Sequence, residues 1–207
     1  QFLAGQYLDI LLKDGRRRSF SIANAPHDDE LLELHIRKID GGEYTTHVFE
    51  SMEEKALLRI EGPLGTFFLR EESDRPLLFI AGGTGFAPIK SILEHAFAEG
   101  LKRPIHFYWG ARDKDSLYLS TLVQSWVEQV ENFSYMPVLS AAKPEDNWNG
   151  RTGFVYEAVV EDFADLSSFD IYTSGPPEMI DAGREAFLKI GMDEDLYFFD
   201  AFTFADD

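Results

Sequence analysis

Through the first 72 residues, hydrophobic and polar positions alternate in short runs with a period of two. Alternation of this kind, interrupted by glycine and charged turns, is typical of β-strands that bury one face. We therefore predict an antiparallel β-barrel with one helix, with strands at 6–12, 18–23, 31–39 and 57–61 and helical turns at 45–52.

From Arg75 onward, apolar runs of strand length alternate with longer segments of helical period. The predicted strands are 77–81, 105–110, 133–139, 170–174 and 196–199, and the predicted helices are 86–99, 117–130, 155–163 and 177–190. Regular alternation of strand and helix predicts right-handed crossovers and an α/β parallel sheet covered on both faces. Because the stretch 70–75 has no apolar residue, we predict one domain at 1–72 and a second at 73–207.

The composition narrows the class of protein. Hydrophobic residues make up 44% of the 207, which is enough for real cores. No apolar stretch approaches the roughly 20 residues of a membrane span, so we expect a soluble, cytoplasmic protein. The net charge of −18 argues against nucleic acid, which requires clustered Lys and Arg. The absence of cysteine excludes disulfides, thiolate metal sites and a cysteine-held iron–sulfur cluster within these residues, and we predict no metal site here.

The most informative segment is a glycine turn after a buried strand. Gly83, Thr84 and Gly85 follow the apolar run 77–80 and precede a helical pattern with Pro88 in its first turn. Glycines that take positive φ let backbone N–H groups approach a pyrophosphate at the start of a helix. The segment therefore predicts dinucleotide binding, although a tight glycine turn between strand and helix also occurs without a ligand.

A second signal lies on the predicted strand 18–23. Its alternation puts Arg18 and Phe20 on one face and Ser19 and Ser21 on the other. A cation beside an aromatic ring suits a ligand with a phosphate and a flat ring. A core phenylalanine beside a snorkelling arginine gives the same pattern, so both interpretations stay open.

A third signal is the glycine turn at 41–42, which leads into a short helix with Thr45 and Thr46 near its start. Free N–H groups at such a turn can hold a diphosphate. A threonine that caps the helix is the alternative.

Five motifs in this order and spacing resemble the ferredoxin–NADP reductase-like flavoprotein superfamily: Arg18–Ser21, Gly41–Gly42 with Thr45–Thr46, Gly62–Phe67, Gly83–Pro88 and Gly175–Met179. Within it, the chain looks like bacterial NAD(P)H:flavin reductases and the reductase modules that follow a plant-type iron–sulfur domain. Residues 5–10 with 18–24 are most similar to CDP-6-deoxy-Δ3,4-glucoseen reductase-type proteins. The resemblance implies a β-barrel flavin domain, incomplete here, followed by an α/β dinucleotide-binding domain.

For FAD, the resemblance implies that Arg18 contacts the diphosphate, that Phe20 covers one face of the isoalloxazine ring and that Ser21 hydrogen-bonds near its N5. The further implied flavin contacts are Ser19, His35, Ile36, Arg37, Gly42, Thr45 and Thr46.

For the nicotinamide dinucleotide, the resemblance implies that the pyrophosphate lies on the glycine turn and that the nicotinamide lies in a pocket built by a second glycine motif. The residues concerned are Gly83, Thr84, Gly85 and Pro88 for the first, and Gly175, Pro176 and Pro177 for the second. Ser174 stands where the family often has cysteine, and we expect Ser21 and Ser174 to be the catalytic side chains. Positioning dominates hydride transfer, so no general acid–base residue is required.

The choice of nicotinamide cofactor depends on the segment after the second strand of the α/β region. Arg112 could pair with a 2′-phosphate, but Asp113 and Asp115 oppose a second negative charge, and a solvated loop arginine is the alternative. We therefore favour NADH over NADPH. At the C-terminus, Phe202 or Phe204 could reach the flavin ring, and we favour plain packing for each.

Family barrels carry two strands before the segment that corresponds to 2–10, and the chain begins at Gln1 rather than at Met. We expect the natural chain to be longer, because an open barrel edge is avoided, and to carry a [2Fe–2S] domain in the segment absent here.

Three functional hypotheses follow. The first is a flavin-dependent oxidoreductase that takes hydride from NAD(P)H and passes electrons to an iron–sulfur centre or a partner oxygenase or dehydrase. The second is an NAD(P)H:flavin reductase that releases reduced free flavin. The third is a non-catalytic nucleotide-binding or interaction module, which the intact motifs at 18–21 and 41–46 disfavour.

Overall fold

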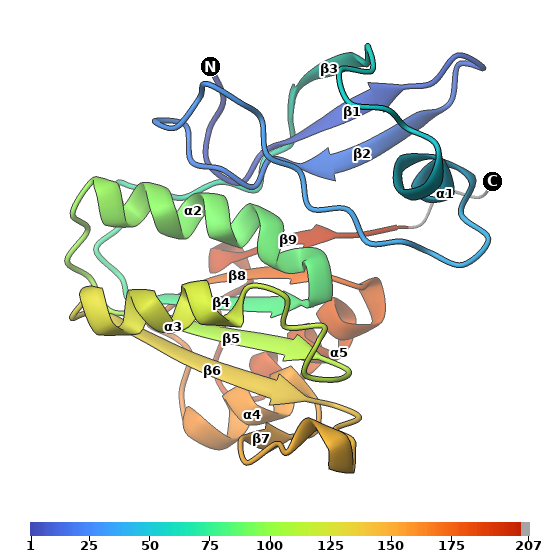
Figure 1. Ribbon diagram of the computed structural model, residues 1–207. Coiled ribbons are helices and arrows are strands. Elements are labelled where there is room, and N and C mark those ends of the chain that lie inside the picture. The colour runs from blue at the N-terminus through green and yellow to red at the C-terminus, as the bar shows by residue number, and fades with distance from the viewer. Residues whose placement is uncertain (204–207) are drawn as a thin grey trace.

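The computed structural model describes residues 1–203 and contains one β-sheet in each half of the chain (Figure 1). The N-terminal sheet is antiparallel, in the order β2-β1-β3, with Ile10 of β1 paired to Arg18 and to Ile60. Its elements are β1 (Tyr7–Leu11), β2 (Arg17–Ser21), α1 (Glu43–Glu50) and β3 (Arg59–Leu64). A small core of Leu8, Ile10, Ile22 and Tyr44 joins the sheet to α1. The antiparallel arrangement is as predicted.

The predicted strand at 31–39 is wrong. Within it the structure has one isolated bridge, between Ile22 and Leu34. The Asn24 side chain donates to the carbonyl oxygens of Asp28 and Leu31 and accepts the Glu33 N–H, at 2.5, 3.0 and 2.8 Å. These bonds fold the segment into a loop, so its alternating apolar residues do not form a strand paired along its length.

The C-terminal sheet has six parallel strands in the order β7-β6-β5-β4-β8-β9, which confirms the predicted parallel α/β arrangement. The strands are β4 (Leu77–Gly82), β5 (Ile105–Ala111), β6 (Phe133–Leu139), β7 (Arg151–Thr152), β8 (Asp170–Gly175) and β9 (Tyr197–Ala201). The two-residue strand β7 was not predicted.

Helices cover both faces of this sheet (Figure 1). They are α2 (Phe86–Ala98) and α3 (Ser120–Gln129) on one face, and α4 (Val155–Asp162) and α5 (Pro177–Leu188) on the other. Three single turns of 3₁₀-helix complete the described elements: η1 (Gly83–Gly85), η2 (Pro144–Asp146) and η3 (Glu194–Leu196). The predicted start of α3 at 117 is three residues early, because the Asp113 carboxylate accepts the Ser116 N–H and hydroxyl and holds a separate turn there.

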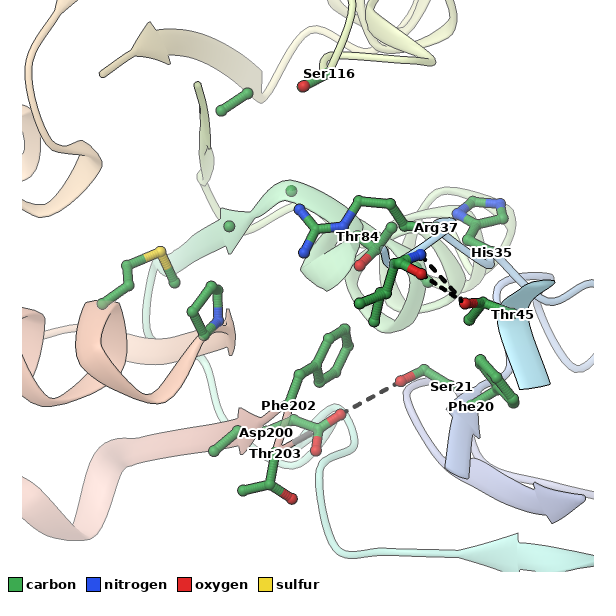
Figure 2. A pocket seen from close by; sticks show the side chains of 18 of the residues that line it. Phe20, Ser21, His35, Arg37, Thr45, Thr84, Ser116, Asp200, Phe202 and Thr203 are labelled. Atoms are coloured by element: carbon green, nitrogen blue, oxygen red, sulfur yellow. Dashed lines mark hydrogen bonds between the residues drawn. The ribbon is translucent and has the colours of Figure 1, made fainter. Parts of the chain in front are cut away.

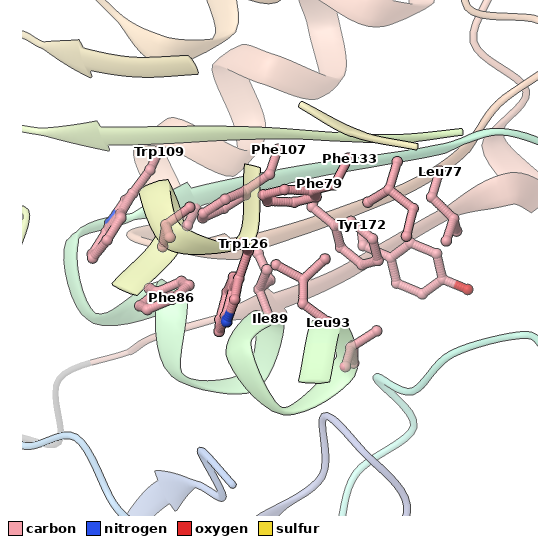
Figure 3. Close-up of a cluster of buried hydrophobic side chains, with 14 of the residues drawn as sticks. Leu77, Phe79, Phe86, Ile89, Leu93, Phe107, Trp109, Trp126, Phe133 and Tyr172 are labelled. Atoms are coloured by element: carbon pink, nitrogen blue, oxygen red, sulfur yellow. The ribbon is translucent and has the colours of Figure 1, made fainter. Parts of the chain in front are cut away.

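The period of two within each strand fills the two cores. Leu77 and Phe79 of β4 pack towards α2 and α3, in the cluster of Figure 3, whereas Leu78 and Ile80 pack towards α4 and α5. In the first cluster, Phe86 stacks on Trp109 with ring centroids 4.2 Å apart. This packing fixes the start of α2 against β5.

The chain order reverses between β4 and β8, since β5, β6 and β7 lie on one side of β4 and β8 and β9 lie on the other. A crevice opens at the carboxyl ends of strands at such a switch point, and ligands of open α/β sheets bind there. The turn that follows β4 and the turn that follows β8 are therefore the expected walls of a site.

Candidate functional site

A cleft of about 830 Å³ lies at the carboxyl ends of the C-terminal strands and faces the N-terminal sheet (Figure 2). Its volume falls in the range of about 300–1,000 Å³ typical of small-molecule sites. Its walls come from β2, the segment 35–45, the ends of β4, β5 and β9, and the starts of α4 and α5.

Strand β2 contributes all four residues of its motif to the lining: Arg18, Ser19, Phe20 and Ser21. The Phe20 ring packs on Tyr44, with centroids 5.8 Å apart, and the Ser19 hydroxyl donates to Asp9 at 2.6 Å. The cleft-facing strand end is thus supported from behind by α1 and from the side by β1.

The segment before α1 brings His35, Arg37 and Gly42 to the cleft and the first turn of α1 brings Thr45, whereas Ile36 and Thr46 do not line it. Helix α1 begins at Glu43 with Gly42 as its N-cap, so the alternative that a threonine caps the helix is wrong. Instead, the Thr45 hydroxyl accepts the Ile39 N–H at 3.2 Å and ties the turn to the helix.

The two glycines of the turn after β4 have different surroundings: Gly83 lines the cleft, whereas Gly85 packs against β8. Gly83 has φ +53° and opens on the cleft with Thr84, and the Trp109 indole N–H donates to the Gly83 carbonyl at 2.9 Å. Gly85 has φ −57°, so the expectation of positive φ is wrong there. A Cβ at Gly85 would lie 2.0 Å from the Ser174 carbonyl oxygen. Gly85 is therefore a contact of η1 with β8, and Pro88 is buried in α2 away from the lining.

The turn after β8 meets the turn after β4. A Cβ at Gly175, whose φ is +147°, would lie 3.0 Å from the Gly82 Cα. Pro176 lines the cleft, whereas Gly175 and Pro177 do not. Ser174 is fully buried outside the lining, and its hydroxyl has no hydrogen-bond partner among residues 1–203.

Asp200, at the end of β9, is a lining residue that the sequence pattern did not indicate. The Ser21 hydroxyl donates to its carboxylate at 3.4 Å, across the cleft from β2 (Figure 2). Burial raises the pKa of Asp200 to about 6, and the Ser21 hydrogen bond opposes that rise. The one available signal was its polarity at the end of an otherwise apolar strand.

Two aromatic side chains complete the cleft. Phe202 lines it, so its position leaves open contact with a flavin, and Phe204 lies outside the described residues. Phe154 lines the opposite end, is 56% exposed and stacks on Tyr156 with centroids 5.6 Å apart and planes at 7°. An exposed ring held flat by a neighbour is a surface on which a planar group can stack.

The charge of the cleft is opposite to that of the chain. The lining includes four arginines and two aspartates, against a net charge of −18 overall. The arginines are Arg17, Arg18, Arg37 and Arg112, and the aspartates are Asp40 and Asp200. Guanidinium groups and free N–H groups at glycine turns are the usual partners of phosphates.

Comparison with known proteins identifies the two halves. Residues 1–69 match the oxidoreductase FAD-binding domain, and residues 79–185 match the oxidoreductase NAD-binding domain. The chain belongs to the ferredoxin–NADP reductase-like family. The N-terminal sheet is the family's FAD-binding domain and the C-terminal sheet its NAD-binding domain, so the cleft lies between a flavin domain and a nicotinamide-dinucleotide domain.

Relatives of the family match almost the whole chain. It is 45% identical to CDP-6-deoxy-L-threo-D-glycero-4-hexulose-3-dehydrase reductase of Yersinia pestis over 98% of this chain and 60% of that protein. It is 42% identical to the NAD(P)H-flavin reductase of Vibrio harveyi over 91% of this chain and 81% of that protein. The structure of the Amycolatopsis cytochrome P450 reductase GcoB has a TM-score of 0.88, with 33% identity over 97% of this chain and 61% of that one.

The chain therefore spans about 60% of the dehydrase reductase and most of the flavin reductase. It contains an oxidoreductase FAD-binding domain and an oxidoreductase NAD-binding domain. None of the helices among residues 1–203 is long and apolar enough to cross a membrane.

Proposed function

We propose that this chain binds FAD against β2 and α1, takes hydride from NADH at the switch point of the C-terminal sheet, and passes electrons to an iron–sulfur centre or a partner oxygenase or dehydrase. One observation carries it: the Arg18–Ser21 motif and the Gly83 turn face the same cleft, where four arginines gather. Bound FAD would supply the ring that accepts a hydride and returns electrons one at a time.

The residues present fit such a ligand. Arg18 would hold the flavin diphosphate together with the turn at Gly42, and Phe20, supported by Tyr44, would cover the ring. The buried Tyr44 hydroxyl has no partner among the described residues. Ser21 would present its hydroxyl to the ring edge, with Asp200 behind it. A pKa of about 6 lets the Asp200 carboxyl hold a proton in a fraction of molecules near neutral pH.

The NADH preference is supported by the charge next to Arg112. Asp113 follows Arg112 in the chain. Its carboxylate accepts hydrogen bonds from the Ser116 hydroxyl and N–H, and these bonds hold the pKa of Asp113 below its ordinary value. An ionised carboxylate beside Arg112 weakens its attraction for a second phosphate. At the other end, the exposed Phe154 ring would stack on the adenine.

A second candidate is release of reduced free flavin to solution. The observation that favours it is the coverage of the Vibrio harveyi flavin reductase, 81% of which the chain spans. In the first function the electrons would go to a [2Fe–2S] domain or a partner protein.

The test is a flavin titration followed by anaerobic reduction with NADH or NADPH. We expect FAD to bind to the chain and its 450-nm absorbance to bleach on addition of NADH, with a higher kcat/KM for NADH than for NADPH. Failure of FAD to bind would overturn the proposed function, and a higher kcat/KM for NADPH would overturn the cofactor preference alone. Flavin that stays bound through turnover favours the electron-transfer role, and flavin that exchanges every turnover favours the free-flavin role.

A further inference from the structure

Helix α2 carries the glycine turn at its start and, one turn further on, contacts the FAD-binding domain. The Lys90 ammonium donates to the Ala23 carbonyl at 3.3 Å and to the Glu33 carboxylate at 3.2 Å, both in the other domain. Its third bond is to Glu94 on its own helix, at 2.9 Å. The Lys90 side chain is 7% exposed, so this is a buried cation whose three donors are all satisfied.

The next residue of α2 makes the same kind of contact. The Ser91 hydroxyl, which is fully buried, donates to the Asn24 carbonyl at 2.8 Å. Two consecutive helix residues therefore hold two consecutive backbone carbonyls of the chain that leaves β2.

These carbonyls lie two and three residues after Ser21, the last residue of β2. The Ala23 N–H donates to the Glu33 carbonyl at 2.8 Å. Ala23, which follows the cleft-facing end of β2, is thus bonded to its own domain through its N–H and to α2 through its carbonyl oxygen.

A second contact runs through His35, which lines the cleft. Its Nε2 lies 2.7 Å from the Glu33 carboxylate, and its Nδ1 lies 2.7 Å from the Tyr118 hydroxyl of the NAD-binding domain. A carboxylate only accepts, so Nε2 carries the proton and the Tyr118 hydroxyl donates to Nδ1. Burial lowers the pKa of His35, although the Glu33 hydrogen bond opposes it, which agrees with this neutral form.

We infer that Lys90, Glu33 and Tyr118 form an interdomain clamp that fixes the cleft-facing end of β2 relative to the Gly83 turn, with Lys90 as its positioning residue. The inference rests on the proposed hydride transfer, because the flavin would be held by one domain and the nicotinamide by the other. A misplacement of about 1 Å between reacting groups can cost on the order of 100-fold in rate. The clamp would supply the fixed geometry that such a transfer needs.

The experiment compares Lys90→Met with Lys90→Arg and Glu94→Gln in the full chain. Stopped-flow reduction of bound FAD gives the limiting rate and the NADH affinity separately. In Lys90→Met we expect the limiting rate to fall by about tenfold or more, with FAD and NADH dissociation constants changed by less than about threefold. Lys90→Arg should recover most of the rate, and Glu94→Gln, which keeps both bonds across the domains, should leave it unchanged.

Amide hydrogen exchange on the same variants without cofactor supplies a readout independent of turnover. Lys90→Met should speed exchange at Ala23 and Glu33 while leaving the amides of α5 as slow as in the parent. Parent-like exchange at 23–35 and a parent-like limiting rate would overturn the clamp, as would equal acceleration of exchange throughout the chain or an equal loss of rate in Glu94→Gln. A parent chain that binds no FAD would instead refute the proposed function, and the exchange comparison would still decide the clamp.

Discussion

The Asp200 carboxyl gives a prediction whose size can be worked from the structure. Burial raises its folded-state pKa from the ordinary 3.8 to about 6, so folding favours the protonated form. At a pH well below 3.8 the group is protonated in both states, and the free energy of unfolding does not change with pH through this group. As the pH rises from about 4 through 6, the unfolded chain ionises this carboxyl more readily than the folded chain does, so the free energy of unfolding falls, by at most about 3 kcal/mol in total.

Asp200→Asn removes this cost because an amide does not ionise. We expect the free energy of unfolding of Asp200→Asn, relative to the parent, to rise by about 1–3 kcal/mol between pH 4.5 and pH 8. Urea unfolding followed by circular dichroism at several pH values measures it, and subtraction of the two proteins cancels the other titrating groups. Ser21→Ala should move the transition to higher pH, since it removes the bond that opposes the raised pKa. If the free energy of unfolding of Asp200→Asn differed from that of the parent by the same amount at every pH, the reasoning would be refuted.

Three further predictions concern the lining and its support. Arg18→Ala should weaken FAD binding by about 1.5–3 kcal/mol in a fluorescence titration, the value of a charge-assisted bond, and unchanged affinity would exclude Arg18 as the diphosphate contact. Gly85→Ala should lower the midpoint of thermal unfolding more than Gly83→Ala does. A Cβ at position 85 would lie 2.0 Å from the Ser174 carbonyl oxygen, whereas a Cβ at position 83 would lie 4.0 Å from the Arg37 side chain. The reverse order of the two midpoints would contradict this packing. Phe154→Ala should raise the NADH dissociation constant by on the order of tenfold with little effect on FAD, as expected from loss of a stacking ring, whereas Phe154→Tyr should not.

Strands β4, β5 and β8 of the C-terminal sheet were predictable because both of their faces are largely buried. Along the chain, mostly apolar segments of strand length alternate with helical segments, and the parallel order follows from that alternation. The segment 31–39 shows the limit of the same reasoning. Its alternation is real, but the bonds of Asn24, seven to nine residues away from Leu31 and Glu33, decide its conformation. Strand β7 has two residues and leaves no periodic signal.

The cleft was predictable only where a local motif carries it. Arg18, Phe20 and Gly83 belong to local motifs from which a nucleotide site was predicted, and all three line the cleft. Asp200 and Phe202 reach the cleft because β9 pairs in parallel with β8, which sets Asp200 beside Ser174 in the sheet. That register depends on the topology of the whole domain, and the sequence around Asp200 alone does not predict it. Phe154 likewise is brought to the lining by the turn that precedes α4.

The charge of the cleft differs in sign from the net charge of the chain, and this difference affects which ligands and partners can approach. A chain with net charge −18 repels an anionic dinucleotide at a distance, yet four arginines line the cleft. Screening at physiological salt limits the repulsion to about 8 Å, whereas the guanidinium groups act on a ligand at contact distance. Acidic residues outside the cleft therefore cost little affinity for a ligand that reaches the arginines. They do oppose the approach of an acidic protein, so an electron acceptor in the same polypeptide, or a small diffusible one, suits this surface better than a free acidic ferredoxin.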